Sequence, residues 1–157
     1  MSDTTAPISR RQFCGACMAS CATLATLATA CGGEGSPTGP SGGSAADLNV
    51  IQGQFANARV QVNTAGTPLA NVGGAARVES NAGLFLVSRT SDTTFTVIDG
   101  VCTHEGCTIS GATVTQYVCP CHGSRYNLTG QVQQGPAKAN LRQYASTFTD
   151  GVVSIAV

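Results

Sequence analysis

Short stretches of alternating apolar and polar residues run through the second half of the chain, as in Arg59-Val60-Gln61-Val62. Alternation of this kind is typical of strands with one buried face. Segments rich in Val, Ile, Thr, Phe and Tyr predict strands at 55–62, 83–89, 95–98, 113–118, 141–148 and 152–157. Turn residues separate these segments, and no long helical period follows residue 45. The pattern predicts an all-β domain, a sandwich or small barrel, over residues 48–157.

Composition narrows the class of function. Eight basic and eight acidic residues balance to a net charge of zero, so the chain has no basic field that would bind nucleic acid. Nineteen glycines and the absence of Trp agree with a fold rich in strands and turns.

The first 30 residues are typical of an export signal. Arg10-Arg11, followed by Phe13, resembles the twin-arginine signal, and an uncharged stretch of small and moderately apolar residues follows to Ala30. An uncleaved membrane anchor is the alternative, although the segment is short and contains many hydroxyl groups. The pair Cys14 and Cys17 matches a dithiol motif, but inside a signal segment we interpret these residues as small hydrophobes.

The end of this segment has two interpretations. An ordinary signal peptidase would cut after Ala30, whereas a lipoprotein signal would make Cys31 the lipid acceptor, with Ala28 where such signals usually have Leu. The Gly/Ser/Pro-rich stretch within 31–47 predicts a flexible tether. We expect the protein on the periplasmic side of a bacterial cell envelope, tethered through Cys31 or through an uncleaved segment.

Both histidines of the chain and four of its eight cysteines fall within residues 102–122. They form two short loops, separated by one predicted strand, and each loop offers a Cys and a His at close spacing. Two ligands from each loop would make a tetrahedral zinc site by count alone. The same set fits an iron–sulfur cluster in which one iron takes two thiolates and the other two imidazoles.

The motifs Cys-Thr-His-Glu-Gly-Cys at 102–107 and Cys-Pro-Cys-His-Gly-Ser-Arg-Tyr at 119–126 resemble those of Rieske iron–sulfur proteins. The resemblance is to the high-potential type found in quinol–cytochrome c oxidoreductases. It implies an antiparallel sandwich or small barrel with a cluster-binding subdomain at one tip. It also implies one [2Fe–2S] cluster, whose inner iron is bound by Cys102 and Cys119 and whose outer iron is bound by His104 and His122.

The resemblance assigns further roles. Cys107 and Cys121 would form a disulfide that joins the two loops, with two buried free thiols as the alternative. Ser124 would donate a hydrogen bond to a bridging sulfide and Tyr126 to the first Cys ligand, and both bonds would raise the reduction potential. Two neutral imidazoles in place of thiolates put that potential at roughly −150 to +300 mV.

Two residues depart from the family pattern. Glu105 stands where quinol-oxidising relatives usually carry an apolar residue. Residues 135–137 resemble the start of the proline-rich loop that covers the cluster, but Lys138 stands where the family usually has a second Pro.

We therefore expect a one-electron carrier without a catalytic site of its own, exported already folded around its cofactor. Electrons would pass from a respiratory-type donor to an acceptor such as a c-type cytochrome. Alternatives are a subunit of a larger quinol–cytochrome c or arsenite-oxidising complex and, more remotely, a structural zinc module. A Rieske oxygenase is excluded because no histidine remains for a mononuclear iron.

Overall fold

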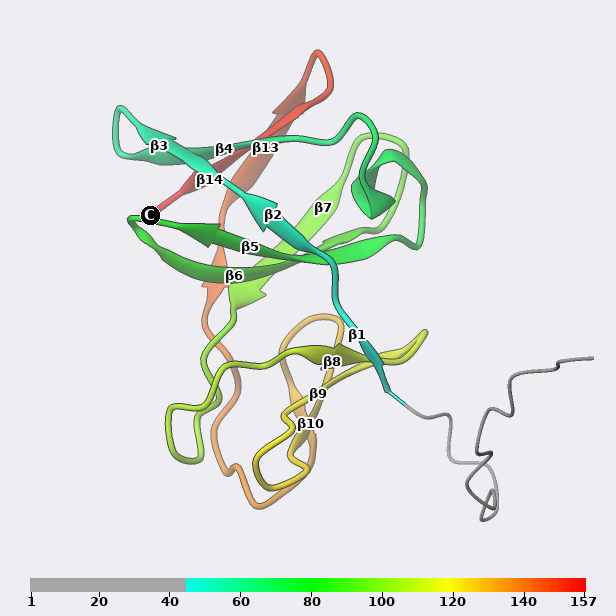
Figure 1. The fold of residues 1–157 in the computed structure, drawn as a ribbon, viewed down its shortest axis with the longest axis vertical. Coiled ribbons are helices and arrows are strands. Elements are labelled where there is room, and N and C mark those ends of the chain that lie inside the picture. Colours follow the sequence, from blue (N-terminus) through cyan, green and yellow to red (C-terminus); the bar gives the residue numbers. More distant parts are fainter. Residues whose placement is uncertain (1–44) are drawn as a thin grey trace, which may run out of the picture. The chain divides into compact units, whose positions relative to one another are not determined.

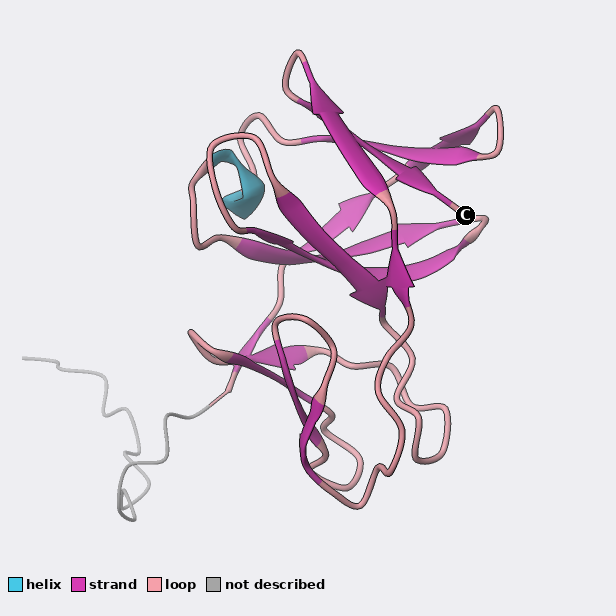
Figure 2. Cartoon of the chain, turned by 180° about the vertical axis from the view of Figure 1, so that it is seen from behind, coloured by secondary structure: helices cyan, strands magenta, loops and turns pink. Residues whose placement is uncertain are grey.

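The structure is a computed structural model that describes residues 45–157. The predicted signal at 1–30, the pair Cys14 and Cys17, the lipidation candidate Cys31 and most of the predicted tether lie outside the described residues. Nearly all regular structure from residue 45 onward is β, apart from the short 3-10 helix η2 (Pro68–Ala70) (Figures 1 and 2). Across this same part of the chain no helix has the length and apolar character needed to cross a membrane.

The strands form three sheets. Sheet A has the order β1 (Ala46–Asp47), β8 (Gly111–Ala112), β9 (Gln116–Val118), β10 (Arg125–Asn127) and β11 (Val132–Gln134). Sheet B has the order β12 (Gln143–Tyr144), β7 (Phe95–Asp99), β6 (Gly83–Arg89), β5 (Ala75–Ser80) and β2 (Val50–Gln52). Sheet C has the order β13 (Ser146–Thr149), β14 (Val152–Ala156), β4 (Arg59–Asn63) and β3 (Gln54–Ala56). Every strand pair is antiparallel except β2 with β5.

Sheets B and C together form what we call the base. The chain passes from one sheet to the other at two corners, because Gly53 alone separates β2 from β3 and Ala145 alone separates β12 from β13. A Cβ atom at Gly53 would lie 2.5 Å from Val60 Cγ1, so only glycine fits this close approach. Between the sheets lies a core of fully buried side chains, among them Val62, Phe85 and Val153.

The opposite face of sheet B supports a second core. Strand β6 is buried on both faces: Phe85 and Val87 point into the base, and Leu86 belongs to the second core. The second core is built mainly from residues 100–142, which we call the insertion, since they leave the base after β7 and return to it at β12. The Asp99 N–H donates to the Arg142 carbonyl over 2.8 Å and closes the neck of the insertion.

The predicted all-β class and the cluster-binding subdomain at one end are confirmed, since the loops of the insertion lie away from sheet C (Figure 1). Three strand predictions were wrong in detail. Residues 55–62 form a hairpin, because Asn57 and Ala58 adopt positive φ angles of 52° and 56° between β3 and β4. Within 113–118 only β9 is a strand, and 141–148 is split at the corner Ala145.

Seven elements lie outside the predicted ranges: β1, β2, β5, β8, β10, β11 and the 3-10 helix η2. Strand β5 carries Ala, Arg, Glu and Ser, which have weak strand propensity, and it forms because its neighbours β6 and β2 pair with it on both sides. Strand β1 lies inside the predicted tether and pairs with β8, so ordered structure begins before the predicted boundary at residue 48.

Candidate metal centre

The two predicted ligand loops, loop 1 (residues 102–107) and loop 2 (119–124), share one backbone structure. In loop 1 the Cys102 N–H donates to the carbonyl of residue 107, and the Gly106 N–H donates back to the Cys102 carbonyl, over 2.8 and 2.9 Å. Loop 2 repeats both bonds from Cys119, over 2.9 and 3.0 Å. Gly106 and Gly123 have φ angles of 74° and 73°, which favour glycine. Both cysteines are thereby held at the start of equivalent turns.

Cys102 and Cys119 lie side by side in the second core as buried cysteines outside any disulfide. Burial raises the pKa of the Cys119 thiol. Burial also tends to raise the pKa of the Cys102 thiol. Hydrogen bonds from Tyr126 and the His104 backbone outweigh this effect and hold that pKa below its ordinary value. Because a thiolate is the form that binds a metal, the pocket around Cys102 is already arranged for a ligand.

His104 and His122 extend the same site toward solvent. Their rings meet edge to face with centroids 4.9 Å apart. Nδ1 of His104 is buried and has no hydrogen-bond partner among residues 45–157. A buried ring nitrogen without a partner is costly unless a ligand satisfies it. Together with the two buried thiols of the same loops, this donor set of two sulfurs and two imidazoles fits a [2Fe–2S] cluster of mixed ligation.

The predicted disulfide between Cys107 and Cys121 is present, with an S–S distance of 2.10 Å. It joins the end of loop 1 to the middle of loop 2 and leaves the predicted ligands outside the bridge. Both sulfurs lie near Cys119 Sγ, but as members of a disulfide they are not thiolate ligands for a metal. The bridge therefore holds the ligand loops together.

Tyr126 reaches the first predicted ligand from β10. Its buried hydroxyl lies 3.3 Å from Cys102 Sγ, 3.0 Å from Thr103 Oγ1 and 3.2 Å from the Thr103 N–H, which donates to it. The Thr103 hydroxyl donates to the Ala139 carbonyl over 2.6 Å. With the Thr103 hydrogen committed in this way, the single tyrosine hydrogen faces two acceptors, Thr103 Oγ1 and Cys102 Sγ. Thr103 was not singled out from the sequence, although it stands inside the motif.

Ser124, the second predicted tuning residue, is fully buried at the end of loop 2. Its Oγ accepts the Ala137 N–H over 3.0 Å, and its own hydrogen is left to donate toward Cys102. The same bond fixes the segment 135–139 against loop 2. This segment also meets loop 1, since Ala139 accepts from Thr103. The segment predicted to cover the cluster thus contacts both ligand loops.

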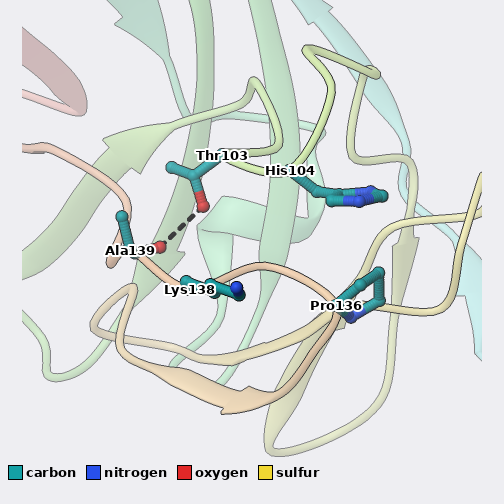
Figure 3. Close-up of a pocket in the computed structure, with 5 residues that line it drawn as sticks. All are labelled: Thr103, His104, Pro136, Lys138 and Ala139. Carbon is teal, nitrogen blue, oxygen red and sulfur yellow. Dashed lines mark hydrogen bonds between the residues drawn. The ribbon is translucent and has the colours of Figure 1, made fainter.

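A pocket of about 370 Å³ opens between loop 1 and this covering segment. Figure 3 shows the His104 ring on one wall and Pro136 and Lys138 on the other, with the Thr103–Ala139 hydrogen bond to the left of the ring. Lys138 is exposed and has no ion-pair partner within the described range. The pocket therefore places one cation beside a predicted ligand.

Glu105 contacts both histidines, which the sequence did not predict. One carboxylate oxygen lies 3.7 Å from His104 Nε2 and the other 3.8 Å from His122 Nδ1. The side chain is 60% exposed, so the carboxylate faces solvent while it spans the two rings. Proximity in sequence to His104 signals the first contact, but the second depends on how the two loops fold together.

Comparison with known proteins gives a family match. The family model of the Rieske [2Fe–2S] domain matches residues 52–145. An iron–sulfur subunit of the cytochrome b6-f complex from Synechocystis is 46% identical over 54 residues, which are 34% of this chain and 30% of that protein. The mitochondrial Rieske subunit of the cytochrome b-c1 complex from Rattus norvegicus is 41% identical over 61 residues, which are 38% and 22% of the two chains.

The chain spans less than a third of the length of these relatives. Among solved structures, a complex of reduced oxygenase and oxidised ferredoxin in carbazole 1,9a-dioxygenase aligns with a TM-score of 0.53 and 23% identity. The alignment covers 64% of this chain and 94% of the other. At that identity the likeness concerns the fold alone.

Proposed function

The chain belongs to the Rieske [2Fe–2S] domain family, and from this premise we propose that it is a one-electron carrier. Its cluster would be held by Cys102, Cys119, His104 and His122. When bound, the cluster supplies a one-electron redox couple. The observation that carries the proposal is the site itself, where the same two loops supply two buried free thiols and a buried imidazole nitrogen that has no partner in the described chain.

The protein's own residues favour a potential in the upper part of the family range. Tyr126 and Ser124 place hydroxyl hydrogens toward Cys102, and hydrogen bonds of this kind stabilise the extra negative charge of the reduced state. The two imidazoles add no negative charge of their own. A respiratory-type donor and an acceptor such as a c-type cytochrome match that range.

A second candidate function is that of the Rieske subunit in a larger quinol-oxidising complex. The observation that favours it is the identity of the relatives, which are subunits of cytochrome b6-f and b-c1 complexes. Both candidates require the same cluster, and they differ in the donor. Co-purification of the full chain with a b-type cytochrome from detergent-solubilised membranes would support the subunit, and isolation as a separate protein would support the carrier.

We also propose export of the folded protein to the periplasmic side of the cell envelope. The residues that support it are Arg10 and Arg11 in a twin-arginine pattern and Cys31 ahead of a Gly/Ser/Pro-rich stretch. Replacing both arginines with lysine should leave the protein in the cytoplasm, and Cys31→Ala should release it from the membrane. Retention of Cys31→Ala in washed membranes would instead indicate an uncleaved N-terminal anchor.

The carrier function is tested by redox titration of the purified holoprotein. We expect a single reversible one-electron transition, followed by visible absorption, and reduction of a c-type cytochrome by the reduced protein at equal concentration of both. A protein that carries the cluster but does not reoxidise in the presence of the cytochrome would contradict the proposed carrier.

A further inference from the structure

The charged groups around His104 are few and distinct. Within residues 100–142 the sole acidic residue is Glu105, and the basic residues are Arg125, Lys138 and Arg142. Arg142 stacks on the Tyr144 ring, with its guanidinium carbon 4.6 Å from the ring centroid, so it belongs to the neck. Glu105 contacts the His104 ring, and Lys138 lines the pocket beside that ring. One anion and one cation therefore flank the same imidazole.

Neither of these two charges is neutralised within the described structure. No lysine or arginine of residues 45–157 pairs with Glu105, whose contacts are with the two rings. Lys138 likewise forms no ion pair in that range and is exposed. Exposed charges without partners contribute little to folding stability. They remain available to a molecule that approaches the exposed edge of the histidines.

Glu105 and Lys138 are placed where they can orient a docking partner. Charges at the rim of a protein interface mainly control the rate and orientation of encounter. A partner that reached His104 with an anionic group over Glu105 would be repelled at close range. A partner with an ammonium or guanidinium group at that point, and a carboxylate over Lys138, would be guided into one orientation.

We propose that Glu105 and Lys138 determine partner specificity, and that together with His104 they form a docking surface for a redox protein of opposite charge pattern. The partner presents a cation opposite Glu105 and an anion opposite Lys138 at the rim of its own redox centre. The inference rests on the proposed electron-carrier function, because it requires that electrons leave near His104. Glu105 is the stronger determinant, since its carboxylate touches both predicted ligand rings.

The test uses two inorganic oxidants of opposite charge, each of which takes one electron from the reduced holoprotein. The anionic probe is hexacyanoferrate(III) and the cationic probe is tris(phenanthroline)cobalt(III). For Glu105→Gln the ratio of the anionic to the cationic rate constant should rise about three- to tenfold at roughly 0.01 M salt and return toward the wild-type ratio near 1 M. Lys138→Gln should lower the same ratio.

The ratio separates local charge from driving force, because a changed reduction potential alters both rates in the same direction. The potential provides a second readout without a partner: removing the carboxylate should raise it, since the reduced state carries more negative charge. Glu105→Asp keeps the charge and should resemble the wild type. Asp92→Asn removes an exposed carboxylate from the base and serves as the matched control.

A partner protein completes the test. Glu105→Gln should slow electron transfer to a basic c-type cytochrome at low salt, and Asp92→Asn should not. All rates are expressed per cluster from the visible absorbance, so incomplete loading of a variant does not alter them. An unchanged probe ratio in Glu105→Gln, or an equal change in Asp92→Asn, overturns the inference while a normal cluster spectrum leaves the carrier function standing. Absence of a cluster in the wild type overturns the carrier function itself.

Discussion

The base and the insertion are both β structure, but different forces hold them. The base has strands of up to seven residues whose inward side chains fill one apolar core between two sheets. The insertion has strands of two or three residues, and its core includes the two cysteines predicted to bind the cluster. The base is therefore stabilised mainly by its large apolar core, whereas the insertion, with shorter strands, also relies on cross-links that its loops supply: a disulfide and a bound cluster.

The largest expected effect is loss of a predicted ligand. Cys119→Ala should abolish the cluster, because it leaves the inner iron with Cys102 as its single thiolate ligand. If the base folds independently of the cluster, amides of β6 keep their protection from hydrogen exchange while those of loops 1 and 2 lose theirs. Iron analysis and exchange mass spectrometry check both parts. Equal loss of protection in β6 would mean that the base also depends on the cluster.

The base should be destabilised by loss of its apolar core and not by loss of the cluster. Phe85 is 1% exposed and packs edge to face on Tyr144, with ring centroids 5.0 Å apart. Phe85→Ala should lower the free energy of unfolding by about 3–5 kcal/mol through a cavity in the core. Urea unfolding followed by circular dichroism measures the loss, and the spectrum of the folded protein's cluster should stay unchanged. A loss under about 1 kcal/mol would contradict the role given to this core.

The disulfide should matter mainly to the insertion. Its two cysteines are 14 residues apart, and replacing both with alanine removes a cross-link worth roughly 3 kcal/mol in a loop of that size. We expect faster release of iron to a chelator, with little change in exchange from β6. Replacement of Val114, which is 93% exposed in the same region, with alanine is the control and should do neither.

Alkaline pH should weaken the insertion through Tyr117. Desolvation by burial raises the pKa of Tyr117 to about 12, against an ordinary value of 10.0. Below about pH 10 the phenol is neutral whether the chain is folded or unfolded; above it the unfolded chain ionises first, so stability falls until about pH 12. The loss is about 1 kcal/mol near pH 11. Tyr117→Phe should remove that slope from urea unfolding curves, and an unchanged slope would assign it to other groups.

The smallest expected effect concerns the fine tuning of the site. Tyr126→Phe removes the hydroxyl near Cys102 Sγ and should lower the midpoint potential by roughly 20–60 mV, if the bond is worth about 0.5–1.5 kcal/mol. Tyr117 is the cross-strand neighbour of Tyr126 and is equally buried, but its hydroxyl forms no hydrogen bond with a predicted ligand. Tyr117→Phe should therefore leave the potential unchanged. Equal shifts in both variants would refute a specific bond.

Much of the site was predictable because its predicted ligands and their neighbours lie in two short sequence motifs, 102–107 and 119–126. Cys107 and Cys121 pair as expected, and Tyr126 reaches Cys102 as expected, because the two motifs resemble those of a family in which these contacts are known. In the base, strands with strong β propensity, such as the doubly buried β6 and the alternating β14, were predicted nearly in full.

The rest depended on contacts between distant segments. The turn at Asn57 and Ala58 lacks the glycine that usually marks a hairpin, so the sequence favoured one continuous strand. Thr103 bonds to Ala139, and Glu105 reaches His122, only after the loops and the covering segment have come together. Local pattern does not encode such partners, and the structure was needed to find the charges beside the histidines.

The central claim is that this site holds a [2Fe–2S] cluster with two thiolate and two imidazole ligands. Electron–nuclear double resonance (ENDOR) of the dithionite-reduced protein tests it most directly, because it detects nitrogen bound to the cluster. We predict a paramagnetic signal coupled to two nitrogens, which becomes one nitrogen or is lost in His104→Cys and in His122→Cys. A colourless protein that contains zinc and gives no signal after reduction, or a cluster without nitrogen coupling, would contradict the account.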